Sequence, residues 1–488
     1  MTAYLITSTA AIPVYGKLSD YFGRKPMLMV GISLFLVGSI LSGLSQTMWQ
    51  LIAFRGIQGL GAGALFPISL AVIGDLFTPA ERGKYQGLFG GVFGVAFLVG
   101  PFLGGVLTDN LSWHWIFFVN VPVGFASLYL IGRLLPTVRT PNVRFSLDVP
   151  GVVTFVGAIV PVLVALTLAE NGNWLDPYVL GWFAVGFVFL LAFLVAESRV
   201  EDPMIPLGLF RNRTFAVSAV ATFLAVFGFS TLIIFLPLWF QVVQGATTTE
   251  SGYLLFPFLF GLIFSSIMAG QIVSRTGRYK WLIVSALGVM AIGLALFSNL
   301  RADTATPVLW LWMLIAGLGV GPTMAIFTLI VQNDVPFAQL GTATSDLTLI
   351  RQIGTSVGLT IAFTIFRNNL TWRLIHDSVV RAGAPATAVP LTTPAGFDPG
   401  ALTSVGSGLS AFSKLPPSLV GFYTDGFHQA FSIAIANSVW IGVVASGLAF
   451  VSALALKEKP LRAHFHAEQA ARTGVRTVAG GRAVEGAE

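Results

Sequence analysis

The stretch Gly16-Lys-Leu-Ser-Asp20-Tyr-Phe-Gly23-Arg24-Lys25 decides the fold, because it is a short polar segment between two long apolar ones. A related stretch, Gly270-Gln-Ile-Val-Ser-Arg-Thr-Gly277-Arg278-Tyr-Lys280, occupies the same kind of gap in the second half of the chain. The glycines permit a tight turn, and the cations stay in water while helices enter lipid on either side. The recurrence indicates a duplicated helical bundle, an arrangement typical of proteins that move solutes.

The composition is that of a membrane protein. Charged residues make up 10% of the 488 residues, against about 25% in soluble domains, and hydrophobic residues make up 55%. Lys and Arg are concentrated in a few loops, so we attribute the net charge of +6 to membrane topology and expect no nucleic-acid binding. The chain has no cysteine, which excludes disulfides and thiolate chemistry, and its five histidines lack metal-site spacing. We expect no metal and no other cofactor.

Thirteen apolar runs are long enough to cross about 30 Å of hydrocarbon. They cover residues 3–19, 27–45, 51–74, 86–107, 115–135, 149–169, 178–196, 214–243, 251–273, 281–298, 307–331, 342–366 and 428–456. If the loop after the first run is cytoplasmic, cytoplasmic segments hold 20 Lys and Arg residues and external segments hold 5. This bias satisfies the positive-inside rule. The sequence therefore predicts an all-α polytopic protein of the inner (cytoplasmic) membrane.

An internal repeat divides the chain into domains. Gly59-Leu-Gly61-Ala-Gly63 recurs as Gly317-Leu-Gly319-Val-Gly321, so the first five runs match the last five, and runs six and seven have no counterpart. Run eight also lacks a partner, so we expect that one more helix precedes residue 1 in a complete, fourteen-helix form. The predicted units are an N-terminal bundle (1–135), a linker with two inserted helices (136–200), a C-terminal six-helix bundle (201–456) with an external loop (367–427), and a disordered cytoplasmic tail (457–488).

These residues resemble the motifs of the major facilitator superfamily, specifically its fourteen-helix drug–proton antiporters of the EmrB/QacA type. The segment 16–25 is similar to the superfamily's loop motif between its second and third helices, and Arg55-Gly-Ile-Gln-Gly-Leu-Gly-Ala-Gly63 to the arginine motif of its fourth helix. Other stretches that resemble family motifs are Gly100-Pro101-Phe-Leu-Gly104-Gly105, Trp115-Ile-Phe-Phe-Val-Asn120, Asp148-Val-Pro-Gly151, Asp202-Pro203 and Arg351-Gln-Ile-Gly354. In that family the first helix usually carries an acidic residue that is important for coupling.

The resemblance implies that the two loop motifs form a gate. The residues concerned are Gly16, Asp20, Gly23, Arg24, Lys25, Gly270, Gly277 and Arg278. The Asp20 carboxylate would contact the N-terminus of run twelve, near Thr342 and Thr344, where free N–H groups and the helix dipole favour an anion. This contact would hold the cytoplasmic side shut. The alternative is that Asp20 is merely solvated in its turn.

Three charged residues inside apolar runs are candidates for coupling transport to protons: Arg55, Asp346 and Arg351. A cation among apolar residues costs several kcal/mol unless it faces the bundle interior or pairs, although Arg55 could instead snorkel to the membrane surface. Asp346 either binds a proton in a partly dry cavity or lies in a cytoplasmic first turn that stabilises its charge. Asp346 and Arg351 lie about 140° apart around a helix, so we expect no direct pair.

Two further groups concern packing and substrate. In run four, seven glycines predict close helix packing, to which the functional interpretation adds a kink at Pro101 and a bendable seam that resists proton leak. The glycines are Gly87, Gly90, Gly91, Gly94, Gly100, Gly104 and Gly105. Candidates for a greasy cavity that accepts lipophilic cations or neutral drugs are Phe227, Phe235, Trp239 and Phe256. The alternative for each aromatic residue is contact with the core or with lipid.

Together these features predict a secondary active transporter that exports drugs or other lipophilic and amphiphilic small molecules by proton antiport with alternating access. The chain has no Walker motif, so the energy would come from an ion gradient. The expected partners are a small-molecule substrate, protons and the lipid bilayer, with periplasmic or envelope accessory proteins as further candidates. The alternatives are an exporter of lipid or another endogenous metabolite, and a non-transporting scaffold or sensor. No constellation of His, Asp or Ser converges in the loops, so we expect no enzyme activity.

Overall fold

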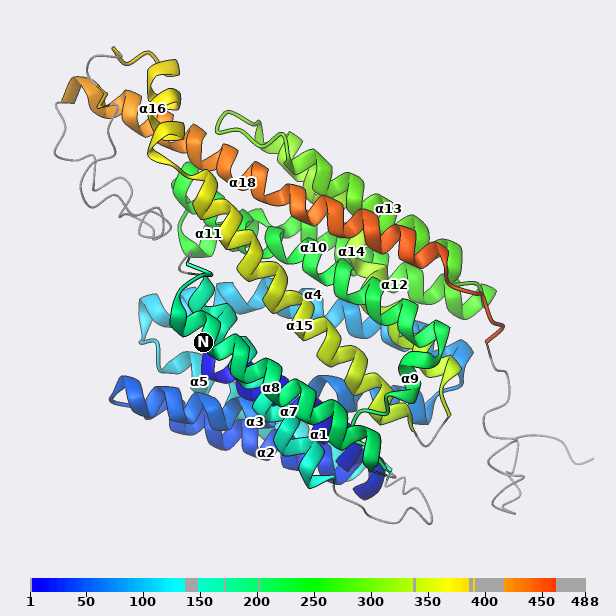
Figure 1. Cartoon of the computed structure of the whole chain (residues 1–488). Helices are drawn as coiled ribbons and strands as arrows, with labels where there is room; N and C mark the ends of the chain where they lie inside the picture. Colours follow the sequence, from blue (N-terminus) through cyan, green and yellow to red (C-terminus); the bar gives the residue numbers. More distant parts are fainter. Residues whose placement is uncertain are drawn as a thin grey trace, which may run out of the picture.

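The computed structural model describes residues 2–136, 148–170, 173–200, 202–336, 339–385, 389–390 and 417–461. Within these ranges the regular secondary structure is helical (Figure 1). Twelve helices are long and apolar enough to cross a membrane. A further helix of 21 residues, α1 (Thr2–Phe22), falls outside that set and carries Lys17 and Asp20. The prediction of an all-α polytopic protein with about thirteen spans is confirmed.

The N-terminal half is a bundle in which two of the long helices, α3 and α4, begin at polar caps. Thr47 accepts a hydrogen bond from Gln50 N at the start of α3, and Thr78 and Glu81 form a capping box at the start of α4. Helices α1 and α2 both pack against α3. The helices are α1, α2 (Arg24–Gly43), α3 (Met48–Leu76), α4 (Pro79–Asn110), α5 (Trp115–Phe118) and α6 (Asn120–Leu134).

The inserted pair, α7 (Val149–Ala169) and α8 (Pro177–Arg199), begins with two aspartate caps. Asp148 accepts from Gly151 N and Asp176 accepts from Tyr178 N. The two helices pack on each other, and α7 also contacts α1 of the N-terminal half and α15 of the C-terminal half. The pair therefore lies alongside the junction of the two halves, as Figure 1 shows.

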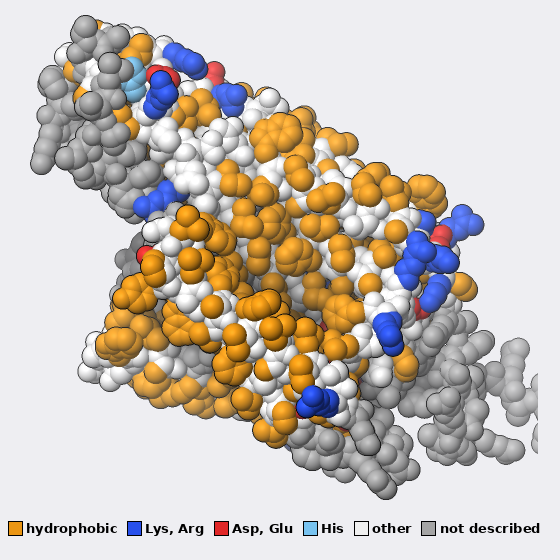
Figure 2. Space-filling view, in the orientation of Figure 1, with side chains coloured by type: hydrophobic (Ala, Val, Ile, Leu, Met, Phe, Trp, Pro, Cys, Tyr) orange, Lys and Arg blue, Asp and Glu red, His pale blue; other side chains and the backbone are white. Residues whose placement is uncertain are grey.

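The C-terminal half contains the largest hydrophobic core of the described residues. Its helices are α9 (Gly208–Arg211), α10 (Arg213–Val243), α11 (Thr248–Leu254), α12 (Phe256–Thr276), α13 (Lys280–Phe297), α14 (Thr306–Asp334), α15 (Leu340–Asn369), α16 (Trp372–Arg381) and α18 (Pro417–Leu454). Figure 2 shows hydrophobic side chains over the middle of one face and Lys and Arg gathered toward its ends, as expected for a protein that spans a bilayer.

Part of the segment 367–427, predicted to be an external loop, is helical. Helix α16 buries Trp372, Ile375 and Val379 on one face, which packs against α18. Helix α18 begins at Pro417, well before the predicted start of the last apolar run. Residues 386–388 and 391–416 of the predicted loop, and residues 462–488 of the predicted tail, lie outside the described residues.

Candidate functional site at the seams between the two halves

The two halves meet along two seams. Helix α1 packs against α15 at one seam, and α4 packs against α12 at the other. Each loop motif lies at the inner end of a seam helix, since α1 ends just before Gly23 and α12 just before Gly277. Both glycines have positive φ, 93° and 68°, a conformation that L side chains rarely adopt. The tight turns predicted from the sequence are present.

Asp20 binds the N-terminus of α15. Its Oδ2 accepts hydrogen bonds from Thr342 N at 2.9 Å and Thr342 Oγ1 at 2.7 Å, and its Oδ1 accepts from Gly341 N at 3.2 Å. Free N–H groups and the positive end of the helix dipole both stabilise this carboxylate. The contact expected from the sequence is therefore present, and we call it the Asp20 latch. It joins the N-terminal half to the C-terminal half.

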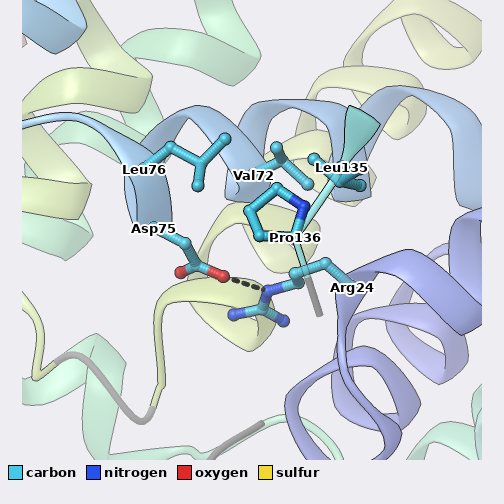
Figure 3. Close-up of a pocket in the computed structure, with 6 residues that line it drawn as sticks. All are labelled: Arg24, Val72, Asp75, Leu76, Leu135 and Pro136. Atoms are coloured by element: carbon cyan, nitrogen blue, oxygen red, sulfur yellow. Dashed lines mark hydrogen bonds and ion pairs between the residues drawn. The ribbon is translucent and has the colours of Figure 1, made fainter. Parts of the chain in front are cut away.

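Arg24 connects Asp20 to a second acid. Its Nη1 lies 2.6 Å from Asp20 Oδ1, and its Nε donates to Asp75 Oδ2 at 2.8 Å (Figure 3). Nη1 also donates to Ser19 Oγ at 2.7 Å. Two carboxylates and a hydroxyl thus satisfy a buried guanidinium, as a buried charge requires. The pocket around the Arg24–Asp75 pair is otherwise lined by apolar residues of α3 and the end of α6: Val72, Leu76, Leu135 and Pro136.

Asp75 is a site residue that the sequence analysis missed. The available signal was an isolated acid in the last turn of α3, close to the cytoplasmic surface. Such an acid is usually solvated, and only the path of α2 brings Arg24 to it. Lys25, the next motif residue, donates to Gly132 O of α6 at 2.8 Å and so fixes the loop to its own half.

Glycines let the helices approach closely at both seams. A Cβ atom on Gly16 would lie 2.4 Å from Ser345 Oγ of α15, and one on Gly270 would lie 2.2 Å from Gly83 O of α4. Neither position leaves room for a side chain without movement of its neighbour. The motif glycines thus act through helix packing at equivalent places in the two repeats.

The repeats differ in charge at these equivalent places. Aligning the two glycine motifs puts Ser274 where the first half has Asp20, and Asn333 where it has Asp75. The second cation, Arg278, is exposed to solvent, whereas Arg24 is buried. The α1–α15 seam is therefore held by charge, and the α4–α12 seam by close backbone contact.

A buried amide network closes the inner end between the seams. Gln332 Nε2 of α14 donates to Leu70 O at 3.1 Å and Thr344 Oγ1 at 3.0 Å, and Gln332 Oε1 accepts from Gln86 Nε2 at 2.8 Å. Arg82 of α4 donates to Gly74 O at 2.5 Å and to Gln332 O at 3.4 Å. Four helices are joined here. The available sequence signal was two glutamines at the ends of apolar runs, Gln86 at the start of run four and Gln332 directly after run eleven.

Asp346 lies deep within α15 and is 1% exposed. No described residue donates a hydrogen bond to either carboxylate oxygen. Because α15 begins at Leu340, Asp346 lies in its second turn and is not stabilised as a first-turn acid. Of the two interpretations left open by the sequence, its position agrees with the buried acid.

Arg351 is also buried, one and a half turns further along α15. Its Nη2 donates to Met324 O at 3.3 Å and lies 3.5 Å from Thr328 Oγ1, while the guanidinium carbon lies 5.6 Å from the centre of the Phe66 ring. Nε and Nη1 find no acceptor among the described residues. It forms no ion pair with Asp346, as the helix geometry predicted.

Arg55 is half-buried near the outer end of α3 and points into its own half. Its Nη1 donates to Gln58 Oε1 at 2.7 Å, and its guanidinium carbon lies 4.2 Å from the centre of the Tyr4 ring and 5.6 Å from that of Phe117. Aromatic faces stabilise a partly desolvated cation. Arg55 is therefore held between α1 and α5 and does not snorkel away from the bundle.

The segment 100–105 lies in the outer half of α4, which continues as a helix through Pro101. Cβ atoms on Gly100 and Gly104 would meet open space, whereas one on Gly105 would lie 2.6 Å from Thr249 Oγ1. The close packing that α4 does make is at its inner half, where Gly83 and Gly87 face α12.

The candidate cavity aromatics occupy different environments. Phe235 and Trp239 are fully buried in the core of the C-terminal half, where Trp239 Nε1 donates to Ser432 Oγ at 2.8 Å. Phe227 is buried, and its carbonyl faces Gly358 of α15. Phe256 is 53% exposed. The structure does not bring these four side chains together in one cavity of the described residues.

Residues 1–359 match the family described as the Major Facilitator Superfamily. The chain belongs to the major facilitator superfamily. Superfamily members are transporters, so this is a multi-pass membrane protein of a class that moves small molecules.

Two curated superfamily relatives of *Bacillus subtilis* (strain 168) cover most of the chain. "Multidrug transporter protein MdtP" is 34% identical over 96% of this chain and 89% of its own length. "Multidrug resistance protein 3" is 38% identical over 76% of this chain and 72% of its own length. Among solved structures, the proton:xylose symporter XylE is 16% identical with a TM-score of 0.56, covering 94% of this chain and 86% of that one. The likeness to XylE concerns the fold alone.

Proposed function

We propose that this superfamily member is a proton-driven exporter of drugs or other lipophilic and amphiphilic small molecules, of the fourteen-helix EmrB/QacA type, in the cytoplasmic membrane. The names of the two relatives support drug export. The inserted pair α7–α8 supports the fourteen-helix type, because it adds two spans between the halves.

One observation carries the proton coupling: Asp346 is a fully buried carboxyl group without a hydrogen-bond donor, beside a closed gate. An ionised carboxylate in such a place would carry its full desolvation cost, so the group is expected to hold a proton in this state. When the inner seam opens, water reaches Asp346 and the proton can leave. Arg351, and Arg55 in the other half, would supply fixed positive charge.

The two seams support the proposed alternating-access cycle. In this structure the Asp20 latch and the Gln332 network close the inner side. Export requires the inner side to open for solute and then to close, so each turnover would break and remake the latch. Arg24 would keep Asp20 oriented through both states, because Asp75 remains on the same half.

The test is proton-driven dye efflux from vesicles that contain the full chain. Asp346→Asn keeps the shape of the side chain and removes its proton exchange, so we expect at least a tenfold loss of pH-gradient-driven efflux. Asp176→Asn, the same change at the cap of α8, is the matched control and is expected to transport normally. Undiminished proton-driven efflux by Asp346→Asn would contradict the proposed coupling.

A further inference from the structure

A second group of buried acids lies where the inserted pair meets the segment that leads into the C-terminal half. Asp148 caps the N-terminus of α7, and Glu197 lies in the last turn of α8. Their exposed fractions are 2% and 3%. Neither belongs to the gate or to the residues proposed above for coupling, so their burial needs its own explanation.

Each of these carboxyl groups uses one oxygen for a backbone donor and leaves the other unused. Asp148 Oδ1 accepts from Gly151 N at 2.8 Å, and Glu197 Oε1 accepts from Ile205 N. The remaining oxygens, Asp148 Oδ2 and Glu197 Oε2, lie 2.1 and 2.8 Å from the point where Gly151 would carry a Cβ atom. Both are buried, and no donor among the described residues reaches either one.

We propose that Asp148 and Glu197 form a proton-binding site in which one proton is shared between Oδ2 and Oε2. Two ionised carboxylates so close together in a buried place repel each other, and one proton replaces that repulsion with a charge-assisted O–H···O hydrogen bond. The proton resides on Glu197, because the C-terminal end of α8 disfavours a negative charge. The N-terminal end of α7 favours the charge of Asp148.

The charges that face the pair agree with one bound proton. Lys17 of α1 is buried beside it, donates to Asp202 O, and lies 3.8 Å from Asp202 Oδ1, which is half exposed. Glu197 interacts electrostatically with Lys17 and with Asp346 of α15. With one proton on the pair and one on Asp346, the buried negative charge of the pair equals the positive charge of Lys17. Without the shared proton, the negative charge is in excess.

A metal ion fits this place less well than a proton. Hard cations take six or more oxygen ligands, whereas only two oxygens are unused here. No group of three or more acidic or His side chains suited to a metal occurs among the described residues.

The site joins parts of the molecule that belong to different units. Ile205 lies on the segment that enters the C-terminal half, Lys17 lies in the loop motif of the N-terminal half, and the acids lie on the inserted pair. A proton bound here therefore joins α7 to α8 next to the gate, at the point where Glu197 also accepts a hydrogen bond from Ile205 N of that segment. This role goes beyond the proposed antiport, which requires only Asp346.

The test is infrared difference spectroscopy of the purified full chain in lipid nanodiscs across a pH titration. All variants carry Asp346→Asn, so that the acid proposed for coupling cannot contribute; this background protein is expected to show the carbonyl stretching band of a buried protonated carboxyl group, lost at high pH. Glu197→Gln and Asp148→Asn should each lose this component, because either amide lets the other carboxyl group ionise. Asp176→Asn is the matched control, since it changes an aspartate cap to asparagine at the outer end of the same helix pair and should keep the band.

Gly151→Ala provides a variant that keeps both acids. Its Cβ would displace both unused oxygens, so the shared band should again disappear. Size-exclusion profiles and thermal unfolding identify variants that fold. In the Asp346→Asn background, retention of the band in a folded Glu197→Gln or Asp148→Asn protein overturns the proposal, as does the absence of a protonated-carboxyl band from Asp346→Asn alone at every pH. No transported solute is needed, so failure here and failure of dye efflux are separate results.

Discussion

At the scale of single residues, Asp20 combines two tasks in one carboxylate. It accepts three hydrogen bonds from the start of α15, and it neutralises Arg24 within its own half. In the proposed cycle, opening the inner side would break the first set of contacts and keep the second. The charge of Asp20 would therefore remain compensated in both states, which limits the free-energy cost of opening.

Asp20→Asn is expected to weaken the closed state. The amide retains one acceptor oxygen and loses the charge, and hydrogen bonds to charged groups contribute about 1.5–3 kcal/mol each. The inner side should open at least tenfold more often. Because the chain has no cysteine, a single Thr348→Cys substitution on α15 reports this as faster labelling by a thiol reagent applied from the cytoplasmic side.

Ser274→Ala is the control for this measurement, because Ser274 is the residue of the second repeat that corresponds to Asp20 and it carries no charge. We expect no change in the labelling rate for it. Equal labelling of the Asp20→Asn protein and the wild type would contradict the latch.

Single residues also mark the limit of what the sequence could predict. Asp20 was recognised because it belongs to a motif whose spacing recurs. Asp75 and Glu197 are lone acids near the ends of apolar runs, where most such acids are solvated. Their partners, Arg24 and Asp148, belong to other helices. Each pair therefore depends on how the helices pack, which the residues next to each acid in the sequence do not indicate.

At the scale of the element, α4 and α12 illustrate packing through glycine. The backbone of Gly270 lies against that of Gly83, and a Cβ atom on Gly87 would lie 2.6 Å from Ser266 O. Small residues let two helices approach until backbone groups touch, a strong source of association in lipid. Glycine spacing predicted this contact at the inner half of α4, where side chains of normal size would separate the halves.

Gly270→Ala should therefore destabilise the protein. The new methyl group would meet the carbonyl oxygen of Gly83, and overpacking of this kind costs about 1–3 kcal/mol. Gly181→Ala in α8 is the control, because nothing lies within 4 Å of its Cβ position. Thermal unfolding in detergent should show a lower Tm for Gly270→Ala alone. A Tm at or above that of the control would show that the seam can relax.

Helix α16 shows why one element was missed. Its ten residues are too few for a membrane span, and they are flanked by Thr, Pro, Ala and Gly typical of loops. Its buried face forms only because Gly426 of α18 gives room to Val379, whose atoms would lie 2.5 Å from a Cβ at that position. A long apolar run can be predicted as a helix from its length alone. A short amphipathic helix forms only when another element offers a surface for its apolar face, and the sequence does not show that surface.

At the scale of the whole molecule, the two seams are unequal. Charged hydrogen bonds, together with the close approach at Gly16, hold α1 against α15, while backbone contacts hold α4 against α12. When the inner side opens, water can replace the hydrogen-bond partners of the charged groups. Water cannot replace the tight packing that the glycines allow between two helix backbones. We therefore expect the halves to rotate about the α4–α12 seam.

Distances between spin labels test this rotation. One pair of cysteines, at Phe22 on α1 and Arg211 on α9, spans the α1–α15 side, and a second pair, at Lys84 and Ile272, spans the α4–α12 side. Combined with Asp20→Asn, the first distance should lengthen clearly and the second should change little. Equal lengthening of both would rule out a rotation about α4–α12.

The length of α18 has a practical consequence. Its 38 residues span roughly 57 Å, which exceeds the thickness of a bilayer with its headgroups. The first turns of α18 therefore stand outside the membrane, and α16 braces them there. Among the described residues, this rigid projection breaks the near-symmetry of the two halves. It gives electron microscopy a feature by which to align images of a small transporter in its micelle.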